Sequence, residues 1–174
     1  LSFLPFFLPS PPGPPAPLGT DMLTAEHVAA TGVEAYTDET GVDIPIAPTI
    51  PVGIAEEHRA FYGTLWVSPD TFRDYVRETV DSLAHHGFDR VVIVNGHGGN
   101  IDALREVTGT ISRHDRAYAV AFTWFESVDS EVKMGHGGPR DTAFIREIRP
   151  DLIREAQIEA AREGASDHWG EWVA

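Results

Sequence analysis

The chain has 174 residues, with 27 acidic against 13 basic residues and a formal net charge of −14 at pH 7. A surface this acidic repels nucleic acid and anionic membranes, so neither is an expected partner. The absence of cysteine excludes disulfides and thiolate metal sites. Lys133 is the only lysine, and such an acid-rich, lysine-poor composition favours a halophilic, high-salt cytoplasm in which salt screens the self-repulsion.

Residues 1–18 contain seven prolines and no charged side chain. The apolar run 1–8 is too short to span a bilayer, and it lacks the basic region and cleavage site of a signal peptide. Because proline disfavours both helix interiors and sheet ladders, this segment predicts a disordered or polyproline-like tail.

Apolar residues at helical spacing after Asp21 predict a helix, with Thr20 or Asp21 as its N-cap. Residues 42–54 are extended and interrupted by prolines, which predicts a strand that runs into a loop. The clearest helix covers 68–87, because Ser68 can cap its start and a proline and a glycine stand at its two ends.

A β-branched run at 90–95 predicts a strand buried on both faces. Residues 100–114 predict a helix and 117–125 a second buried strand. Residues 141–164 predict a helix that is broken near Pro150. This alternation of strand and helix predicts βαβ units and a parallel sheet.

The stretch VVIVNGHGGN places His97 among glycines, just past the carboxyl end of the first predicted strand. Open parallel sheets bind ligands at that end of their strands, and glycines let the backbone turn sharply there. Asn100 can cap the helix that follows. The stretch is neither a dinucleotide fingerprint nor a phosphate loop, which argues against a nucleotide-binding module. The alternative is a tight turn whose histidine is incidental.

A second glycine-flanked histidine, His136, follows the second predicted strand and precedes a helix that carries Asp141. Both histidines should then lie at one sheet edge, and histidine with carboxylate suits zinc, manganese or iron. Asp21 is a third candidate ligand, although it can equally cap its helix. Glu57 and His58 form a further polar pair, which a solvated surface loop explains as well.

Four stretches in order resemble the creatininase family of metal-dependent amidohydrolases. They are PLGTDMLTA at 17–25, EEHRAFYGTLWVSPDTF at 56–72, VVIVNGHGGN at 91–100 and GHGGPRDTAF at 135–144. The resemblance implies a three-layer α/β fold in which helices flank a mostly parallel sheet. The family includes creatinine amidohydrolase, a formamidopyrimidine deformylase and a peptidase that matures a redox peptide cofactor, and its members are typically hexamers.

The resemblance implies roles for individual residues. Asp21 and His97 match metal ligands of the family, and Asp141 stands where the family usually has a ligand glutamate. His136 matches the histidine that handles protons at the scissile amide. Asp141 keeps the carboxylate of the usual glutamate but reaches one methylene less far.

Four further residues are expected to bind the substrate. They are Glu57, His58, Gly98 and Asn100, which match segments at the substrate entrance or beside the metal loop. Gly99 stands where creatinine amidohydrolase carries a metal-binding glutamate. That departure argues against creatinine as the substrate and for the subgroup that carries the letters NGHGGN.

The largest departure from the family lies upstream of the first metal loop. Ser10 and Pro12 occupy the places of a glutamate and a histidine ligand, and neither binds a metal well. We therefore expect 1–16 to be a non-family segment, such as a wrong-frame reading of the gene. Residues 17–174 are expected to be a partial family domain that is truncated at both ends.

Together these observations predict a cytoplasmic amidohydrolase that cleaves a non-peptide C–N bond of a small-molecule amide. One or two divalent ions per chain would activate the attacking water. Deformylase-like cleavage of a formamide is favoured over opening of the creatinine ring. The alternatives are a catalytically inactive family member that serves as a binding or assembly subunit, and an acidic α/β domain whose histidines only cap turns.

Overall fold

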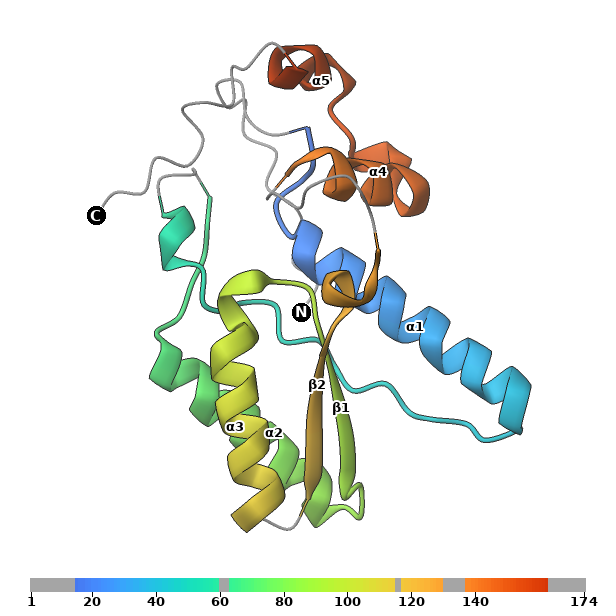
Figure 1. Ribbon diagram of the computed structural model, residues 1–174, viewed down its shortest axis with the longest axis vertical. Helices are drawn as coiled ribbons and strands as arrows, with labels where there is room; N and C mark the ends of the chain where they lie inside the picture. The colour runs from blue at the N-terminus through green and yellow to red at the C-terminus, as the bar shows by residue number, and fades with distance from the viewer. Residues whose placement is uncertain (1–14, 60–62, 115–116, 130–136, 163–174) are drawn as a thin grey trace. The chain divides into compact units, whose positions relative to one another are not determined.

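The computed structural model describes 15–59, 63–114, 117–129 and 137–162 (Figure 1). The chain divides into two compact units. The sheet unit comprises Asp21–Glu56 and Leu65–Asp129, and the terminal unit comprises Leu1–Thr20, Glu57–Thr64 and Ser130–Ala174.

The sheet unit is built on two parallel strands. Strand β1 (Arg90–Asn95) pairs with β2 (Tyr118–Thr123) in a register that places Arg90 opposite Tyr118 and Asn95 opposite Thr123. Helix α3 (Ile101–His114) connects the two strands as a crossover. The predicted βαβ unit and parallel sheet are therefore confirmed, although β2 is shorter than the expected 117–125.

Helix α2 (Pro69–His85) precedes β1 and begins at the predicted cap. The Ser68 hydroxyl accepts a hydrogen bond from Thr71 N at 3.2 Å, which satisfies one of the unpaired amides of the first turn. Just past its end, Gly87 has φ 93°, a left-handed conformation that glycine adopts without strain.

Helices α2 and α3 lie together on one side of the two strands (Figure 1). Buried apolar side chains form the core between these layers. They include Phe72, Val76 and Val80 from α2, Leu104, Val107 and Ile111 from α3, and Ala119 from β2. Burying each larger side chain contributes about 1.5–3 kcal/mol relative to leaving it in water. This packing fixes β1, and with it the turn at its carboxyl end.

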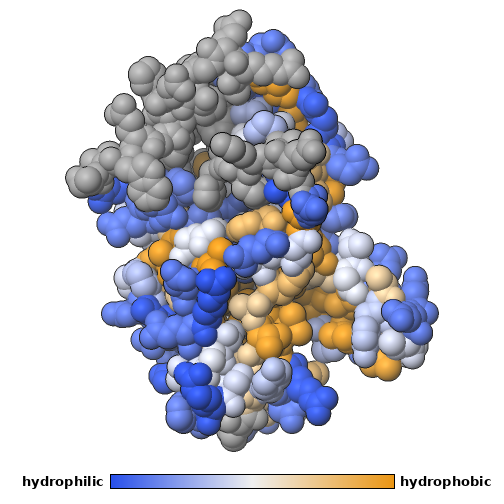
Figure 2. Space-filling view, in the orientation of Figure 1, coloured by the Kyte–Doolittle hydropathy of each residue, from blue (hydrophilic) through white to orange (hydrophobic). Residues whose placement is uncertain are grey.

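The opposite face of the two strands is open. Val92 has 66% of its surface exposed, and Tyr118, Val120 and Phe122 are exposed beside it. Figure 2 shows hydrophobic residues gathered over the strands. The expectation of strands buried on both faces is therefore wrong for the described residues. A β-branched run reports strand propensity, whereas burial on the second face requires a covering layer that a local pattern does not specify.

Helix α1 (Thr20–Thr40) confirms the helix predicted after Asp21 and is longer than expected. It ends where Gly41, at φ 71°, donates its N–H to Thr37 O. The predicted strand in 42–54 is wrong, because that stretch is irregular until the one-turn helix η1 (Glu56–His58). Its three prolines lack the N–H groups that a sheet ladder needs.

The rest of the sheet unit's regular structure is short. A single turn, η2 (Gly98–Asn100), joins β1 to α3, and η3 (Trp124–Ser127) follows β2. No helix in the described part of the chain is long and apolar enough to span a membrane.

The terminal unit contains α4 (Pro139–Ile148), the turn η4 (Pro150–Leu152) and α5 (Glu155–Arg162), so the break expected near Pro150 is confirmed. The Arg149 guanidinium hydrogen-bonds both carboxylate oxygens of Asp151. These bonds lower the pKa of the Asp151 carboxyl and raise the pKa of Arg149.

Candidate metal site at the end of strand β1

The turn after β1 carries the first of the two predicted histidines. His97 has an extended backbone, with φ −123° and ψ 131°, and it immediately precedes η2. Only 7% of its surface is exposed, so the imidazole is held inside the sheet unit. The glycine-rich stretch therefore forms a sharp strand-to-helix turn at the carboxyl edge of the sheet, where parallel sheets bind ligands.

Asp21 reaches this turn from the first turn of α1. Its Oδ2 lies 2.9 Å from Nδ1 of His97. The approach requires glycine at position 96, because a Cβ on Gly96 would collide with the backbone carbonyl oxygen of Asp21. The structure thus brings together two residues that lie 76 positions apart in the chain and were both predicted as metal ligands.

The pair fits a divalent cation. Two ligand atoms bonded at about 2.0–2.2 Å to one ion lie roughly 3 Å apart, and a carboxylate oxygen with an imidazole nitrogen is a common donor set. At 2.9 Å, Nδ1 of His97 can also donate a hydrogen bond to the Asp21 carboxylate, and the pair is ionic only when both ring nitrogens carry a proton.

Asn95, the last residue of β1, stabilises the turn through side-chain hydrogen bonds. It was not among the predicted site residues. Its Oδ1 accepts from His97 N at 3.2 Å, and its Nδ2 donates to His97 O at 2.8 Å and to Thr123 Oγ1 at 3.1 Å. The sequence signal was a polar side chain ending each of the two apolar strand runs. Only the parallel register shows that these two residues face each other.

Asn100 and Gly98 complete the described part of this turn. The Asn100 side chain accepts from Ile54 N at 2.9 Å and donates to Asn95 Oδ1 at 3.2 Å, so it braces the turn rather than capping α3 as expected. A Cβ added at Gly98 would meet no atom within 4 Å, so space lies beside the turn. Binding of substrate by either residue stays a prediction.

The second glycine-rich turn is described from Gly137 onward and belongs to the terminal unit. Asp141 is buried, with 4% of its surface exposed, and its Oδ2 accepts from Gly137 N at 3.0 Å. It therefore satisfies a backbone amide at the start of α4. His136 lies outside the described residues, as do Ser10 and Pro12, so the roles expected of them stay predictions.

Glu57 and His58 lie in η1, and both are half-buried. Glu57 Oε1 stands 3.9 Å from His58 Nε2, a distance that binds weakly and only when the imidazole is charged. A fully solvated loop, one of the two expectations for this pair, does not describe them. Their role at a substrate entrance stays a prediction.

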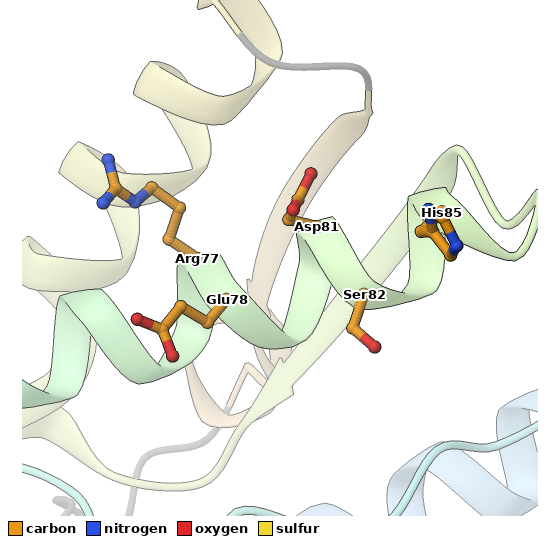
Figure 3. Close-up of a pocket in the computed structure, with 5 residues that line it drawn as sticks. All are labelled: Arg77, Glu78, Asp81, Ser82 and His85. Carbon is orange, nitrogen blue, oxygen red and sulfur yellow. The ribbon is translucent and has the colours of Figure 1, made fainter.

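A shallow hollow elsewhere on the sheet unit is not a second site. It is lined by Arg77, Glu78, Asp81, Ser82 and His85, all from α2. Figure 3 shows these side chains fanning outward from the helix instead of converging on one point. A binding site needs polar groups that converge, so this hollow is a solvated helix face.

Comparison with known proteins places the chain. Residues 12–174 match the family model named Creatininase and described as creatinine amidohydrolase. The chain belongs to the creatininase family. The family resemblance drawn from the four motifs is therefore confirmed.

Two relatives of the chain are named mycofactocin precursor peptide peptidase. The protein of Mycolicibacterium smegmatis is 31% identical over 141 residues, covering 81% of this chain and 55% of that protein. The protein of Mycobacterium ulcerans is 32% identical over 151 residues, covering 85% and 58% respectively. The chain therefore spans a little more than half the length of these curated relatives.

Solved creatininase structures share the fold. A crystal structure of creatinine amidohydrolase aligns with a TM-score of 0.68 at 22% identity, covering 84% of this chain and 64% of that one. A structure titled "Creatininase Mn" aligns with a TM-score of 0.60 at 22% identity, covering 82% and 63%. At this identity the likeness shows the fold alone, and it confirms the predicted α/β class with helices flanking a parallel sheet.

Proposed function

We propose that the protein is a metal-dependent hydrolase that cleaves an amide C–N bond. The observation that carries the proposal is the pair of Asp21 Oδ2 and His97 Nδ1, 2.9 Å apart at the carboxyl edge of the sheet. Family membership supports it, as do the titles of solved creatininases, one with manganese and one described as "Zn-Zn type". Zinc, manganese and iron all suit these donors, with one or two ions per chain.

A bound divalent ion would supply Lewis acidity and lower the pKa of an attacking water. In the proposal, Asp21 contributes an anionic oxygen and His97 a neutral nitrogen. Asp141 keeps the ligand role that the family resemblance implies. An amide nitrogen leaves readily only when it is protonated, and the resemblance gives that proton transfer to His136, since imidazole titrates near neutral pH.

The favoured substrate class is a small non-peptide amide, such as a formamide. Gly99 in place of the glutamate of creatinine amidohydrolase supports a substrate other than creatinine. We propose that Glu57, His58, Gly98 and Asn100 contact this substrate, as the matching segments imply. A peptide is the second candidate, because the relatives at 31% and 32% identity are named as a precursor peptide peptidase.

Three further properties are proposed from composition and family resemblance: a cytoplasmic location, adaptation to high salt, and assembly into a homohexamer. The formal charge of −14 supports the second, since salt screens repulsion between acidic side chains. Sedimentation and thermal melts of the full chain between low and molar KCl test the last two. Unchanged stability across that range would contradict salt adaptation.

The direct test of the activity uses the full chain, freed of metal with a chelator and reloaded with Mn²⁺ or Zn²⁺. We expect hydrolysis of at least one compound from a panel of formamides, creatinine and short peptides, only in the presence of the ion. Asp21→Asn should lower the rate by at least about 100-fold, because loss of a ligand exceeds the 10–100-fold cost of losing a residue that only orients one.

The matched control is Asp102→Asn, which removes an exposed carboxylate from the first turn of α3 and should keep the full rate. Equal rates for the two variants would contradict the proposal. Binding of metal by the wild-type chain without turnover of any amide would instead favour a catalytically inactive family member that acts as a binding or assembly subunit.

A further inference from the structure

The buried amide of Asn95 is the most completely bonded polar side chain around the candidate metal site. Only 4% of the residue is exposed. Its Oδ1 accepts from His97 N at 3.2 Å, and its Nδ2 donates to His97 O at 2.8 Å. The side chain thus bonds the backbone on both sides of His97. Together these bonds fix the φ and ψ of His97, and so the direction in which the imidazole leaves the backbone.

The same amide is anchored from outside the turn. Its Nδ2 also donates to Oγ1 of Thr123, which is buried at the end of β2, and its Oδ1 also accepts from Asn100 Nδ2. An asparagine amide offers two donors and two acceptor positions, and all four are used here. Asn100 is tied in turn to Ile54 N at 2.9 Å. A buried polar network satisfied to this degree is rigid and specifies one geometry.

A merely structural role explains this arrangement poorly. An apolar residue at the end of β1 would continue the core without the desolvation cost of a buried amide. The hydrogen bonds of Asn95 converge instead on the one residue of the turn whose imidazole faces a carboxylate.

We propose that Asn95 is a positioning residue, which holds His97 Nδ1 against Asp21 and is itself held by Thr123 and Asn100. The purpose that we assign to this positioning, which is metal binding, rests on the proposed function. The positioning itself is a property of the metal-free chain. The two are therefore testable apart.

Two variants probe the network with little change of shape. Asn95→Asp keeps an acceptor for His97 N but places an oxygen against His97 O, so one of the two bonds becomes a repulsion. Thr123→Val removes the acceptor for Asn95 Nδ2, whereas Thr123→Ser restores a hydroxyl. The Thr123 pair decides the matter if Asn95→Asp does not fold.

The first readout is the affinity for Mn²⁺ alone, measured on the full chain from the electron paramagnetic resonance signal of the free ion. We expect Asn95→Asp and Thr123→Val to weaken the affinity about 10-fold or more, as is typical for residues that orient a ligand. Thr123→Ser should stay within about 2-fold of wild type, since it keeps the hydroxyl acceptor.

The second readout is the pair of ring ¹⁵N chemical shifts of His97 in the metal-free chain at one fixed pH. These shifts report the tautomer and the hydrogen bond at Nδ1, so we expect them to move in Asn95→Asp and Thr123→Val. The control is Thr108→Val, which removes a buried hydroxyl that donates to Leu104 O within α3. It should leave both the shifts and the Mn²⁺ affinity unchanged.

The outcomes separate the two proposals. If the ring shifts of His97 in both network variants equal those of Thr108→Val, the positioning role of Asn95 is overturned. If the wild-type chain binds no Mn²⁺ while the ring shifts still move, the metal function fails and the positioning role stands. Moved shifts with unchanged Mn²⁺ affinity would overturn the claim that the positioning serves the metal.

Discussion

The turn after β1 and the turn before α4 are written in nearly the same letters, GHGGN and GHGGP, yet they are held differently. In the first, Asn95 bonds the backbone on both sides of His97 and joins it to Thr123 on the neighbouring strand. In the second, Asp141 accepts from Gly137 N, only four residues away. The glycines permit both turns, and the flanking side chains determine which residues each turn is hydrogen-bonded to.

This difference matters for function. A hydrogen bond within four residues stabilises only its own turn, whereas a bond to a distant segment fixes a side chain relative to another element. The turn after β1 has hydrogen bonds of both kinds. It also contacts Asp21, which can come this close because Gly96 has no Cβ. The turn after β1 therefore has the more extensive hydrogen bonding of the two turns, and the predictions below probe each of these contacts.

The largest effect is expected from Gly96→Ala. The new methyl group would press on the backbone carbonyl of Asp21, so α1 must move away from the turn. Overpacking of this kind costs about 1–3 kcal/mol of unfolding free energy, and Mn²⁺ binding should be lost as Asp21 retreats from His97. Denaturant unfolding and Mn²⁺ titration measure the two effects.

Gly98→Ala is the matched control two residues further on, because a Cβ there meets nothing within 4 Å. It should change neither the unfolding free energy nor the Mn²⁺ affinity appreciably. Similar losses of unfolding free energy and Mn²⁺ affinity in both glycine variants would show that the close approach of α1 is not the reason for glycine at position 96.

The next effect is expected from Asp141→Asn, which tests the local turn. An asparagine still accepts from Gly137 N, so the unfolding free energy should fall by no more than about 1 kcal/mol. The ligand role proposed for Asp141 requires its charge, so Mn²⁺ affinity should fall clearly further than in Asp70→Asn, an exposed first-turn control on α2. Equal affinities would reduce Asp141 to a helix cap.

A smaller effect is expected from Gly53→Ala. Its methyl group would press on the amide of Asn100, which must shift and loosen its bond to Ile54 N. We expect the unfolding free energy, measured by chemical denaturation, to fall by about 1 kcal/mol. Gly32→Ala, in the open interior of α1, should instead stabilise by about 0.5–1 kcal/mol. A higher unfolding free energy in both Gly53→Ala and Gly32→Ala would contradict the role of Asn100 in bracing the turn.

The smallest effect concerns Asp151 in the terminal unit. Because Arg149 lowers the pKa of this carboxyl in the folded chain, the pair stabilises above the carboxyl's ordinary pKa. That contribution is lost as the pH falls through the lowered folded value. Asp151→Asn should therefore flatten the acid limb of a plot of Tm against pH slightly, and it should leave Mn²⁺ binding unchanged, since the pair is exposed. A neutral-pH Tm loss of several degrees would contradict this.

Much of the fold could be predicted from local patterns. The bounds of β1 were found to the residue, and α2 was anchored by the Ser68 cap and by Gly87. The failures concern partners that lie elsewhere in the chain. Residues 42–54 have an extended pattern but no strand to pair with, and the β-branched strands have a cover on one face only among the described residues.

The candidate site divides in the same way. The glycines and the imidazole marked His97, and Asp21 was a candidate ligand or helix cap for which the family resemblance favoured the ligand role. Asn95 was missed, because an asparagine at a strand end is common and its partners are the next turn and the neighbouring strand. The register sets Asn95 opposite Thr123, and the structure shows that the amide is buried and uses all four of its hydrogen-bonding positions.

The central claim is that the turn after β1 binds a divalent metal through His97 and Asp21. The most direct measurement is a Mn²⁺ titration of the full chain for the wild type, His97→Ala and His114→Ala. The electron paramagnetic resonance signal of the free ion reports how much Mn²⁺ remains unbound. We expect saturable binding by the wild type and by His114→Ala, whose substitution lies at the exposed end of α3, and a loss of at least about 10-fold in affinity for His97→Ala. Absence of saturable binding by the wild type, or equal affinity in the two histidine variants, would contradict the claim.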